Sequence, residues 1–267
     1  MLKKLYCYLP SLNQCWVIVF FLIVVGGLGV GTLLTVICRY MGVDATSINP
    51  LLSYVLPIIP ALLYIHFSAP ETGDGTSIGF NPGKLAYYPL YAAAILALGF
   101  VTEPLSSLFP MPEYMLEIFE KILNNSVLAF VTTVVAAPIL EEYLLRGVIE
   151  RGLLKHTTPL QAILWSSFFF AVIHLNPWQA IPAFILGLLF GYVYYRTGSL
   201  KLTMLMHCVN NTLATIFSRI PAFEDAETFM DVLAPWKYAG IYAASLVILI
   251  CAIIIVRAIP VKDQKMG

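Results

Sequence analysis

A few polar and ionisable residues interrupt segments of this sequence that are otherwise strongly apolar. They lie in the stretches APILEEYLLRGVIER, LQAILWSSFFFAVIHLNP and SLKLTMLMHCVNNTLATIF, and they are Glu141, Glu142, Arg146, His174, His207, Asn210 and Asn211. A carboxylate with two histidines suits water activation, because the carboxylate can act as a general base while one histidine shares the water. The second histidine and an amide can stabilise an oxyanion. The same residue types can instead bind zinc, here through Glu141, His174 and His207, although the sequence has no HExxH motif.

The two adjacent glutamates have different predicted partners. Glu142 and Arg146 are spaced i, i+4 with the acid first, which is the favoured order for an ion pair on a helix. Glu141 points about 100° away from Glu142 on a helix, so a different group must satisfy it. We therefore expect Glu142 and Arg146 to support the helix, and Glu141 to be the chemically active carboxylate.

The remaining polar residues also pair by helical spacing. His207 and Asn211 are spaced i, i+4, as are Phe170 and His174, so each pair is expected to share a face of its helix. A charge at the centre of a membrane helix costs about 2.5–3.5 kcal/mol on insertion scales, so such residues usually face a partner or a water-filled cavity. We therefore predict that both histidines lie close to Glu141 in the fold.

The segment around Glu141 has two further features. At about 1.5 Å per residue, Glu141 lies roughly 13 Å from an expected membrane boundary near Glu150. Pro138 precedes Glu141 by one turn, where a proline kinks a helix and leaves a backbone carbonyl without its donor. The carboxylate is therefore expected within the membrane, beside irregular backbone.

The composition indicates a polytopic membrane protein. The chain has 267 residues, of which 60% are hydrophobic and 11% charged, and its mean hydropathy is +0.84. Soluble proteins have about 25% charged residues, so these charges are too few to cover a soluble fold of this length. The balance of 15 basic and 15 acidic residues argues against a nucleic-acid partner. The five scattered cysteines predict neither a disulfide framework nor a zinc knuckle.

Hydropathy predicts eight membrane spans of roughly 20 residues each. They are expected at 15–37, 49–67, 86–102, 126–147, 160–176, 179–195, 200–219 and 237–257. The first is longer than the h-region of a signal peptide and has no A-x-A site after it, so we interpret it as a retained span. The connections 110–125 and 222–235 are predicted to be amphipathic helices at the interface. The expected fold is all-α, with one membrane domain over 1–267 and a catalytic core at 126–219.

Basic residues predict the orientation. With both termini cytoplasmic, the lysines and arginines of the amino terminus, of the fourth and sixth connections and of the tail all lie inside, as the positive-inside rule expects. The exceptions are Arg39, Lys121, Arg219 and Lys237. Because no targeting sequence is recognised, we expect a multi-pass protein of the cell (plasma or inner) membrane.

Three short motifs resemble those of a known protease family. EEYLLR matches EExxxR, FAVIH matches FxxxH and HCVNN matches HxxxN, in that order. Together they resemble the CPBP family of CaaX proteases and bacteriocin-processing enzymes, whose eukaryotic members are the Ras-converting CaaX endopeptidases. The resemblance implies a CaaX-protease-like bundle of about eight transmembrane helices.

The resemblance also implies a role for each matching residue. Glu141 would activate the hydrolytic water together with His174, while His207 and Asn211 would stabilise the oxyanion or complete the site. Members of the family are named both glutamate proteases and metalloproteases. We favour catalysis without a metal, since the set offers only two histidines and a carboxylate from three helices; zinc is the alternative cofactor. The supporting residues would be Glu142, Arg146 and Phe170.

The leading hypothesis is an intramembrane endopeptidase. Its partners would be membrane lipid and a membrane-associated or lipidated substrate, of prenylated CaaX type or bacteriocin type. One alternative is a proton-coupled transporter or channel, against which the lack of internal repeats in the sequence argues. The other is a non-catalytic immunity or scaffold protein of the same fold, against which the intact set of motif residues argues.

Overall fold

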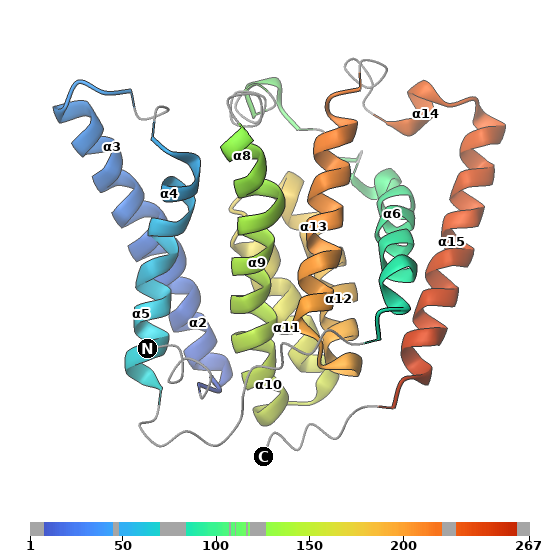
Figure 1. Cartoon of the computed structure of the whole chain (residues 1–267), viewed down its shortest axis with the longest axis horizontal. Helices are drawn as coiled ribbons and strands as arrows, with labels where there is room; N and C mark the ends of the chain where they lie inside the picture. The colour runs from blue at the N-terminus through green and yellow to red at the C-terminus, as the bar shows by residue number, and fades with distance from the viewer. Residues whose placement is uncertain are drawn as a thin grey trace.

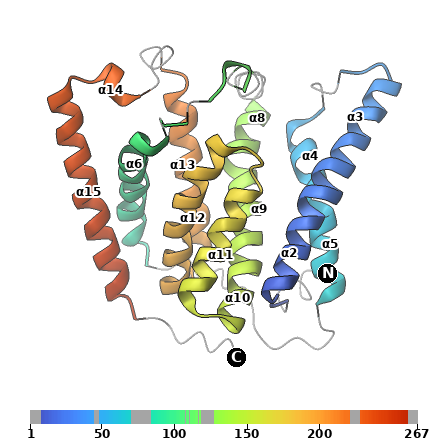
Figure 2. The same ribbon diagram turned by 180° about the vertical axis from the view of Figure 1, so that it is seen from behind.

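In the computed structural model, the chain is a bundle of helices (Figures 1 and 2). The structure describes residues 8–44, 48–69, 84–106, 108–109, 111–115, 117, 127–220 and 228–260. Over these residues all regular secondary structure is helical, and no strand is present. The predicted all-α fold class is confirmed.

Three helical segments precede the region that carries the motifs. The first consists of α2 (Leu12–Phe20), the π-helical η1 (Phe21–Val30) and α3 (Gly31–Tyr40). The second consists of α4 (Pro50–Val55), the 3₁₀ segment η3 (Leu56–Ile58) and α5 (Ile59–Ser68), and the third is α6 (Tyr87–Ser106). We call the first two segments, Leu12–Tyr40 and Pro50–Ser68, the first helical pair.

The fourth segment carries both glutamates and is the most irregular. It consists of α8 (Val127–Val131), the π-helical η4 (Thr132–Ala136), α9 (Ala137–Glu142), the π-helical η5 (Tyr143–Glu150) and α10 (Arg151–His156). The later helices are α11 (Pro159–Val172), α12 (Pro177–Thr197), α13 (Leu200–Phe217), the short α14 (Phe229–Val232) and α15 (Pro235–Ala258).

Six of the described helices are long and apolar enough to cross a membrane. They are Leu12–Tyr40, Pro50–Ser68, Tyr87–Leu105, Val127–His156, Pro177–Thr197 and Pro235–Ala258. Helices α11 and α13 lie at the two other predicted spans; α11 is apolar but has only 14 residues, and α13 carries the polar residues of the third motif. The chain is therefore a multi-pass membrane protein.

Two predicted boundaries are wrong. The fourth segment does not end at 147 but continues to His156, and Glu150, expected at a membrane boundary, is fully buried within it. Helix α11 ends at Val172 instead of 176 because the next helix starts at once: Asn176 caps it in an extended conformation and Pro177 occupies its first position. The predicted interfacial helices are described in part: residues 113–115 and 117 of the first are helical, and the second contains α14.

The helices are arranged in three groups. Figures 1 and 2 show the first helical pair on one side, α6 and α15 on the other, and α8–α13 between them. The start of α2 and the end of α15 lie at the same end of the bundle (Figure 1). At that end Arg151 donates to the backbone oxygen of Tyr8 at 3.2 Å, and Arg196 donates to the backbone oxygens of Arg257 and Ile259. These contacts tie the two outer groups to the central one.

The core of the central group is built on close helix packing. Helices α11 and α12 pack closely, and a Cβ added at Gly187 would lie 3.0 Å from the Cα of Ser167. Phe169, Phe170 and Phe190 are fully buried beside this contact. The absence of a side chain at Gly187 thus brings α12 close enough for its backbone to reach the motif residues.

Candidate active site

The helix that carries Glu141 has a freed carbonyl beside the glutamate. In η4 the backbone bonds run to the fifth residue, as shown by the N–H of Ala137 donating to the oxygen of Thr132. In this register the oxygen of Thr133 would accept from residue 138, which is a proline and has no N–H. The side-chain amide of Asn211, from α13, donates to this oxygen at 2.9 Å. Asn211 therefore supplies the hydrogen bond that Pro138 removes.

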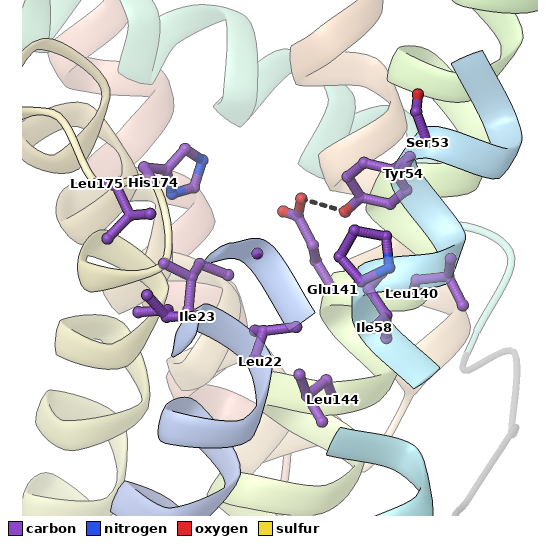
Figure 3. A pocket seen from close by; sticks show the side chains of 13 residues that line it. Leu22, Ile23, Ser53, Tyr54, Ile58, Leu140, Glu141, Leu144, His174 and Leu175 are labelled. Atoms are coloured by element: carbon purple, nitrogen blue, oxygen red, sulfur yellow. Dashed lines mark hydrogen bonds between the residues drawn. The ribbon is translucent and has the colours of Figure 1, made fainter. Parts of the chain in front are cut away.

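A cavity of about 220 Å³ lies between the first helical pair and the motif-bearing helices. Its walls come from η1, from α4 and η3, from the α9–η5 junction and from the turn after α11, and most of them are apolar. Figure 3 shows Glu141 and His174 pointing into this cavity from opposite sides. The other lining residues with a polar side chain are Ser53 and Tyr54.

Glu141 has a separate neighbour for each carboxylate oxygen. The hydroxyl of Tyr54 donates to its Oε1 at 2.6 Å, and Nε2 of His207 lies 3.8 Å from its Oε2. The side chain is 17% exposed, whereas that of Glu142 is fully buried. Of the two adjacent carboxylates, only Glu141 is accessible from the cavity.

Glu142 belongs to a buried ionic cluster on the other face of the same helix. Nη1 of Arg146 donates to Oε1 of Glu142 at 2.8 Å, forming the i, i+4 pair expected from the spacing, and its Nε lies 3.9 Å from Oε2 of Glu150. All three side chains are fully buried. Arg146 also donates to the backbone oxygen of Gly187 at 3.1 Å.

Two phenylalanines enclose the arginine of this cluster. The guanidinium carbon of Arg146 lies 4.8 Å from the ring centroid of Phe170 and 5.4 Å from that of Phe190. Cation–π contacts of this kind are strongest where water is excluded. The cluster therefore fixes the geometry of the residues around it.

His207 connects the two faces of the helix. Its Nδ1 lies 3.1 Å from Oε1 of Glu142, and because a carboxylate only accepts, the hydrogen of this bond belongs to Nδ1. Nε2 is then the nitrogen that faces Glu141. The ring is held between Phe170 and Phe190, with centroid distances of 5.3 Å and 5.4 Å.

His174 lies outside the helix on which the sequence placed it. It occupies the turn after α11, followed by Leu175 in the left-handed region with φ 57°, so the expected helical face shared with Phe170 is wrong. The turn nevertheless keeps the two residues together: Nδ1 of His174 donates to the oxygen of Phe170 at 2.7 Å, and the ring centroids are 5.1 Å apart. Because that carbonyl can only accept, Nε2 of His174 is left free to accept a hydrogen bond.

The structure therefore divides the predicted residues into two sets. Glu141 and His174 line the cavity. His207 does not line it, but its Nε2 lies 3.8 Å from Oε2 of Glu141. Asn211 holds a backbone carbonyl and also accepts from Asn210 at 3.1 Å. The supporting residues Glu142, Arg146 and Phe170 are fully or almost fully buried around His207.

Sequence reasoning missed two residues of this region. Tyr54 lies in a span without a motif, and one tyrosine among 15 gave no signal. Glu150 is expected from the sequence near the membrane boundary, because a charged residue is almost never fully buried unless it is paired. Its spacing of i, i+4 from Arg146 was the signal that could have found it.

The alternative hypothesis is a metal ion bound by Glu141, His174 and His207. Among the residues that the structure describes, no three His, Cys, Asp or Glu side chains come together as a group that could hold a metal ion. The alternative ligand set of Glu141, His174 and His207 is therefore not assembled in this conformation.

The comparison with known families identifies the motif-bearing region. The sequence model of the type II CAAX prenyl endopeptidase Rce1-like family matches residues 123–213. The chain carries an Rce1-like domain. The match confirms the resemblance inferred from the three motifs and supports a membrane endopeptidase at family level. No curated protein and no solved structure gives a significant match.

The Rce1-like domain contains all the motif residues but only part of the cavity. Glu141 and His174 fall within the matched residues, as do His207 and Asn211. The walls formed by η1, α4 and η3 come from the first helical pair, which lies outside the match.

Proposed function

We propose that this chain is an intramembrane endopeptidase in which Glu141 activates the water that hydrolyses a peptide bond. The observation that carries the proposal is the shared cavity: the carboxylate of Glu141 and the imidazole of His174 both line it, within a bundle of membrane helices. A carboxylate and a histidine with a free acceptor nitrogen are the groups needed to hold a water and remove its proton.

In the proposed reaction, Glu141 takes a proton from a water that His174 also hydrogen-bonds. The resulting hydroxide adds to the carbonyl carbon of the substrate and forms a tetrahedral oxyanion. Glu141 then passes the proton to the amide nitrogen as the carbon–nitrogen bond breaks. The base returns to its carboxylate form, so atoms and charge balance over one turnover.

His207 is the proposed donor to the oxyanion. Its Nδ1–H donates to Glu142, and its Nε2, which is directed toward Glu141, would donate to the oxyanion in the doubly protonated imidazolium form. A donor preorganised in a water-poor site stabilises a developing oxyanion more strongly than water does. Asn211, one turn further along α13, would complete the site by holding α13 against η4 through Thr133.

We infer that this reaction proceeds without a metal ion. The residues that would act as ligands do not form a group in the described part of the chain. A peptide-cleavage assay carried out in the presence of 1,10-phenanthroline or EDTA tests this inference. Unchanged turnover is expected, whereas a loss that added zinc restores would contradict it.

The substrate is proposed to be a membrane-associated protein or peptide, of the prenylated CaaX type or the bacteriocin type. A peptide of this kind can reach a cavity that lies between membrane helices and has mostly apolar walls.

We further propose that the catalytic core is 126–219 within one domain of 1–267, and that both termini face the cytoplasm of a cell membrane. Cysteine accessibility labelling in intact cells would test this orientation.

The function is tested by a peptide-cleavage assay with the full chain in nanodiscs. A library of membrane-anchored peptides, with and without a prenyl group, is incubated with wild type, Glu141→Ala and His174→Ala. We expect wild type to cleave some members and both variants to lose turnover. The exposed Glu113→Ala and the α5 variant His66→Ala, whose residues lie outside the cavity lining, are matched controls that should keep activity.

The assay also separates the alternative functions. Hydrolysis that survives both substitutions would refute the assigned mechanism. If no peptide is cleaved but the chain dissipates a proton gradient across a liposome, the transporter hypothesis is favoured. If neither activity is found, the hypothesis of a non-catalytic immunity or scaffold protein of the same fold is favoured.

A further inference from the structure

The proposed base is hydrogen-bonded by a residue from outside the Rce1-like domain. Tyr54, in α4, donates its hydroxyl to Oε1 of Glu141 at 2.6 Å, and this contact joins residues 87 positions apart (Figure 3). The length is within the range of about 2.5–2.7 Å typical of an O–H donor on a carboxylate. Both residues line the cavity, so the bond lies where the substrate would have to bind.

The position of Tyr54 is fixed by close packing within the first helical pair. A Cβ at Gly26 would lie 1.8 Å from the backbone oxygen of Pro57, so η1 and η3 are in direct backbone contact there. At the start of α4 the side chain of Asn49 accepts from the backbone N–H of Leu51 at 3.0 Å. Helix α4 in turn packs against α8 and η4 of the motif-bearing segment. The hydroxyl is thus presented to Glu141 by ordered helices.

The bond has a specific consequence for the carboxylate. A glutamate side chain has several freely rotating bonds, and the described contacts of Glu141 with its own helix do not fix its orientation. With Oε1 held by Tyr54, Oε2 lies 3.8 Å from Nε2 of His207. Glu141 therefore accepts a hydrogen bond from α4, while its other carboxylate oxygen faces a histidine of α13.

We propose that Tyr54 is a positioning residue for Glu141, so that the first helical pair forms part of the active site together with the Rce1-like domain. This inference rests on the proposed function, because it assumes that Glu141 is the base. Loss of the hydroxyl would leave the cavity and the base in place but free the carboxylate to rotate. Misplacement of a reacting group by about 1 Å costs up to 100-fold in rate.

The test is Tyr54→Phe, measured by steady-state cleavage of a peptide that wild type cuts. We expect kcat to fall by about 10- to 100-fold with KM changed by less than about twofold, because the substitution affects orientation of the base and not the cavity. Tyr64→Phe is the matched control: Tyr64 lies in α5 of the same helical pair and loses a comparable bond, the one donated by Tyr8 at 3.3 Å. That variant should keep the wild-type kcat.

Two further variants test whether the loss of kcat in Tyr54→Phe acts through the carboxylate of Glu141. Thr35→Val removes a hydroxyl of the same helical pair that lies outside the cavity lining, and it should leave kcat unchanged. In a Glu141→Gln background, Tyr54→Phe should produce no additional loss of the residual rate, since its effect passes through the carboxylate. A full additional loss in that background would overturn the proposal, as would a Tyr54→Phe enzyme with wild-type or increased kcat.

Failure of this inference is distinguishable from failure of the proposed function. If Glu141→Ala abolishes cleavage while Tyr54→Phe behaves like Tyr64→Phe, Tyr54 is not a positioning residue and the assignment of the base stands. If Glu141→Ala cleaves like wild type, the proposed function itself is wrong. Equal thermal midpoints of the two tyrosine variants in detergent would show that a loss in Tyr54→Phe does not come from unfolding.

Discussion

The two faces of the helix Val127–His156 carry the same residue type in different environments. On one face Glu141 borders the cavity, is 17% exposed and accepts one hydrogen bond from a tyrosine. On the other face Glu142 is fully buried and is bound by both Arg146 and His207. A carboxylate that is to activate water must reach water, whereas a fully buried and paired carboxylate can only hold its neighbours.

His207 is the residue through which the two faces act together. It contacts Glu142 through Nδ1 and Glu141 through Nε2. The buried face can therefore determine the position of the groups on the cavity face without touching the substrate. This division predicts that substitutions on the buried face reduce stability first, and substitutions on the cavity face reduce the rate first.

The largest effect on stability is expected from Arg146→Met. The side chain is similar in volume, but the substitution leaves Glu142 and Glu150 buried without their cation. Breaking a buried ion pair by removing one partner costs about 3–5 kcal/mol. We expect a strongly lowered thermal midpoint in detergent. Lys201→Met, on the exposed part of α13, is the control and should leave the midpoint unchanged; equal midpoints for the two variants would mean that the buried cluster is not structural.

A smaller loss is expected from Gly187→Ala, which separates α12 from α11. The new Cβ would lie 3.0 Å from the Cα of Ser167, so α11 has to give by a few tenths of an ångström, and this strains the position of the carbonyl that accepts from Arg146. Overpacking of this kind costs about 1–3 kcal/mol. Gly99→Ala, where nothing lies within 4 Å of an added Cβ, should be neutral or slightly stabilising. The measurement is again the thermal midpoint, and an unchanged value for Gly187→Ala would contradict the close contact.

The smallest of these effects is expected from Asn211→Ala. The oxygen of Thr133 would lose the donor that replaces the missing N–H of Pro138, and a part-buried hydrogen bond of this kind contributes about 0.5–1.5 kcal/mol. Asn210→Ala, which removes only a bond to Asn211, should cost less. A double variant with Pro138→Ala sharpens the test, because the restored N–H should reduce the stability loss caused by Asn211→Ala. If the losses simply add, the amide does not act on the freed carbonyl.

Much of the fold was predictable because it depends on local composition. Eight helical segments lie at the eight predicted positions, since each needs only a run of apolar residues. The pair of Glu142 and Arg146 was also predictable, because i, i+4 geometry is a property of the helix itself.

The remainder depends on contacts between distant segments. His174 lies in a turn because Asn176 and Pro177 start the next helix. The apolar residues around His174 led the hydropathy analysis to extend the preceding helix past this signal. Tyr54 could not be found, because its partner lies 87 residues away and nothing in its own span distinguishes it. The burial of Glu150 likewise depends on packing against α12, where a Cβ at Gly191 would lie 2.8 Å from its Oε2.

The different roles of the two glutamates are tested most directly by comparing Glu141→Gln with Glu142→Gln, each measured for kcat and for thermal midpoint on the same preparation. For Glu141→Gln we expect a loss of about a thousandfold in kcat with a midpoint close to that of wild type, since a general base is lost from an accessible position. For Glu142→Gln we expect a clearly lowered midpoint and a smaller loss of kcat. A wild-type kcat for Glu141→Gln, or a large loss of kcat for Glu142→Gln with an unchanged midpoint, would mean that Glu141 is not the base.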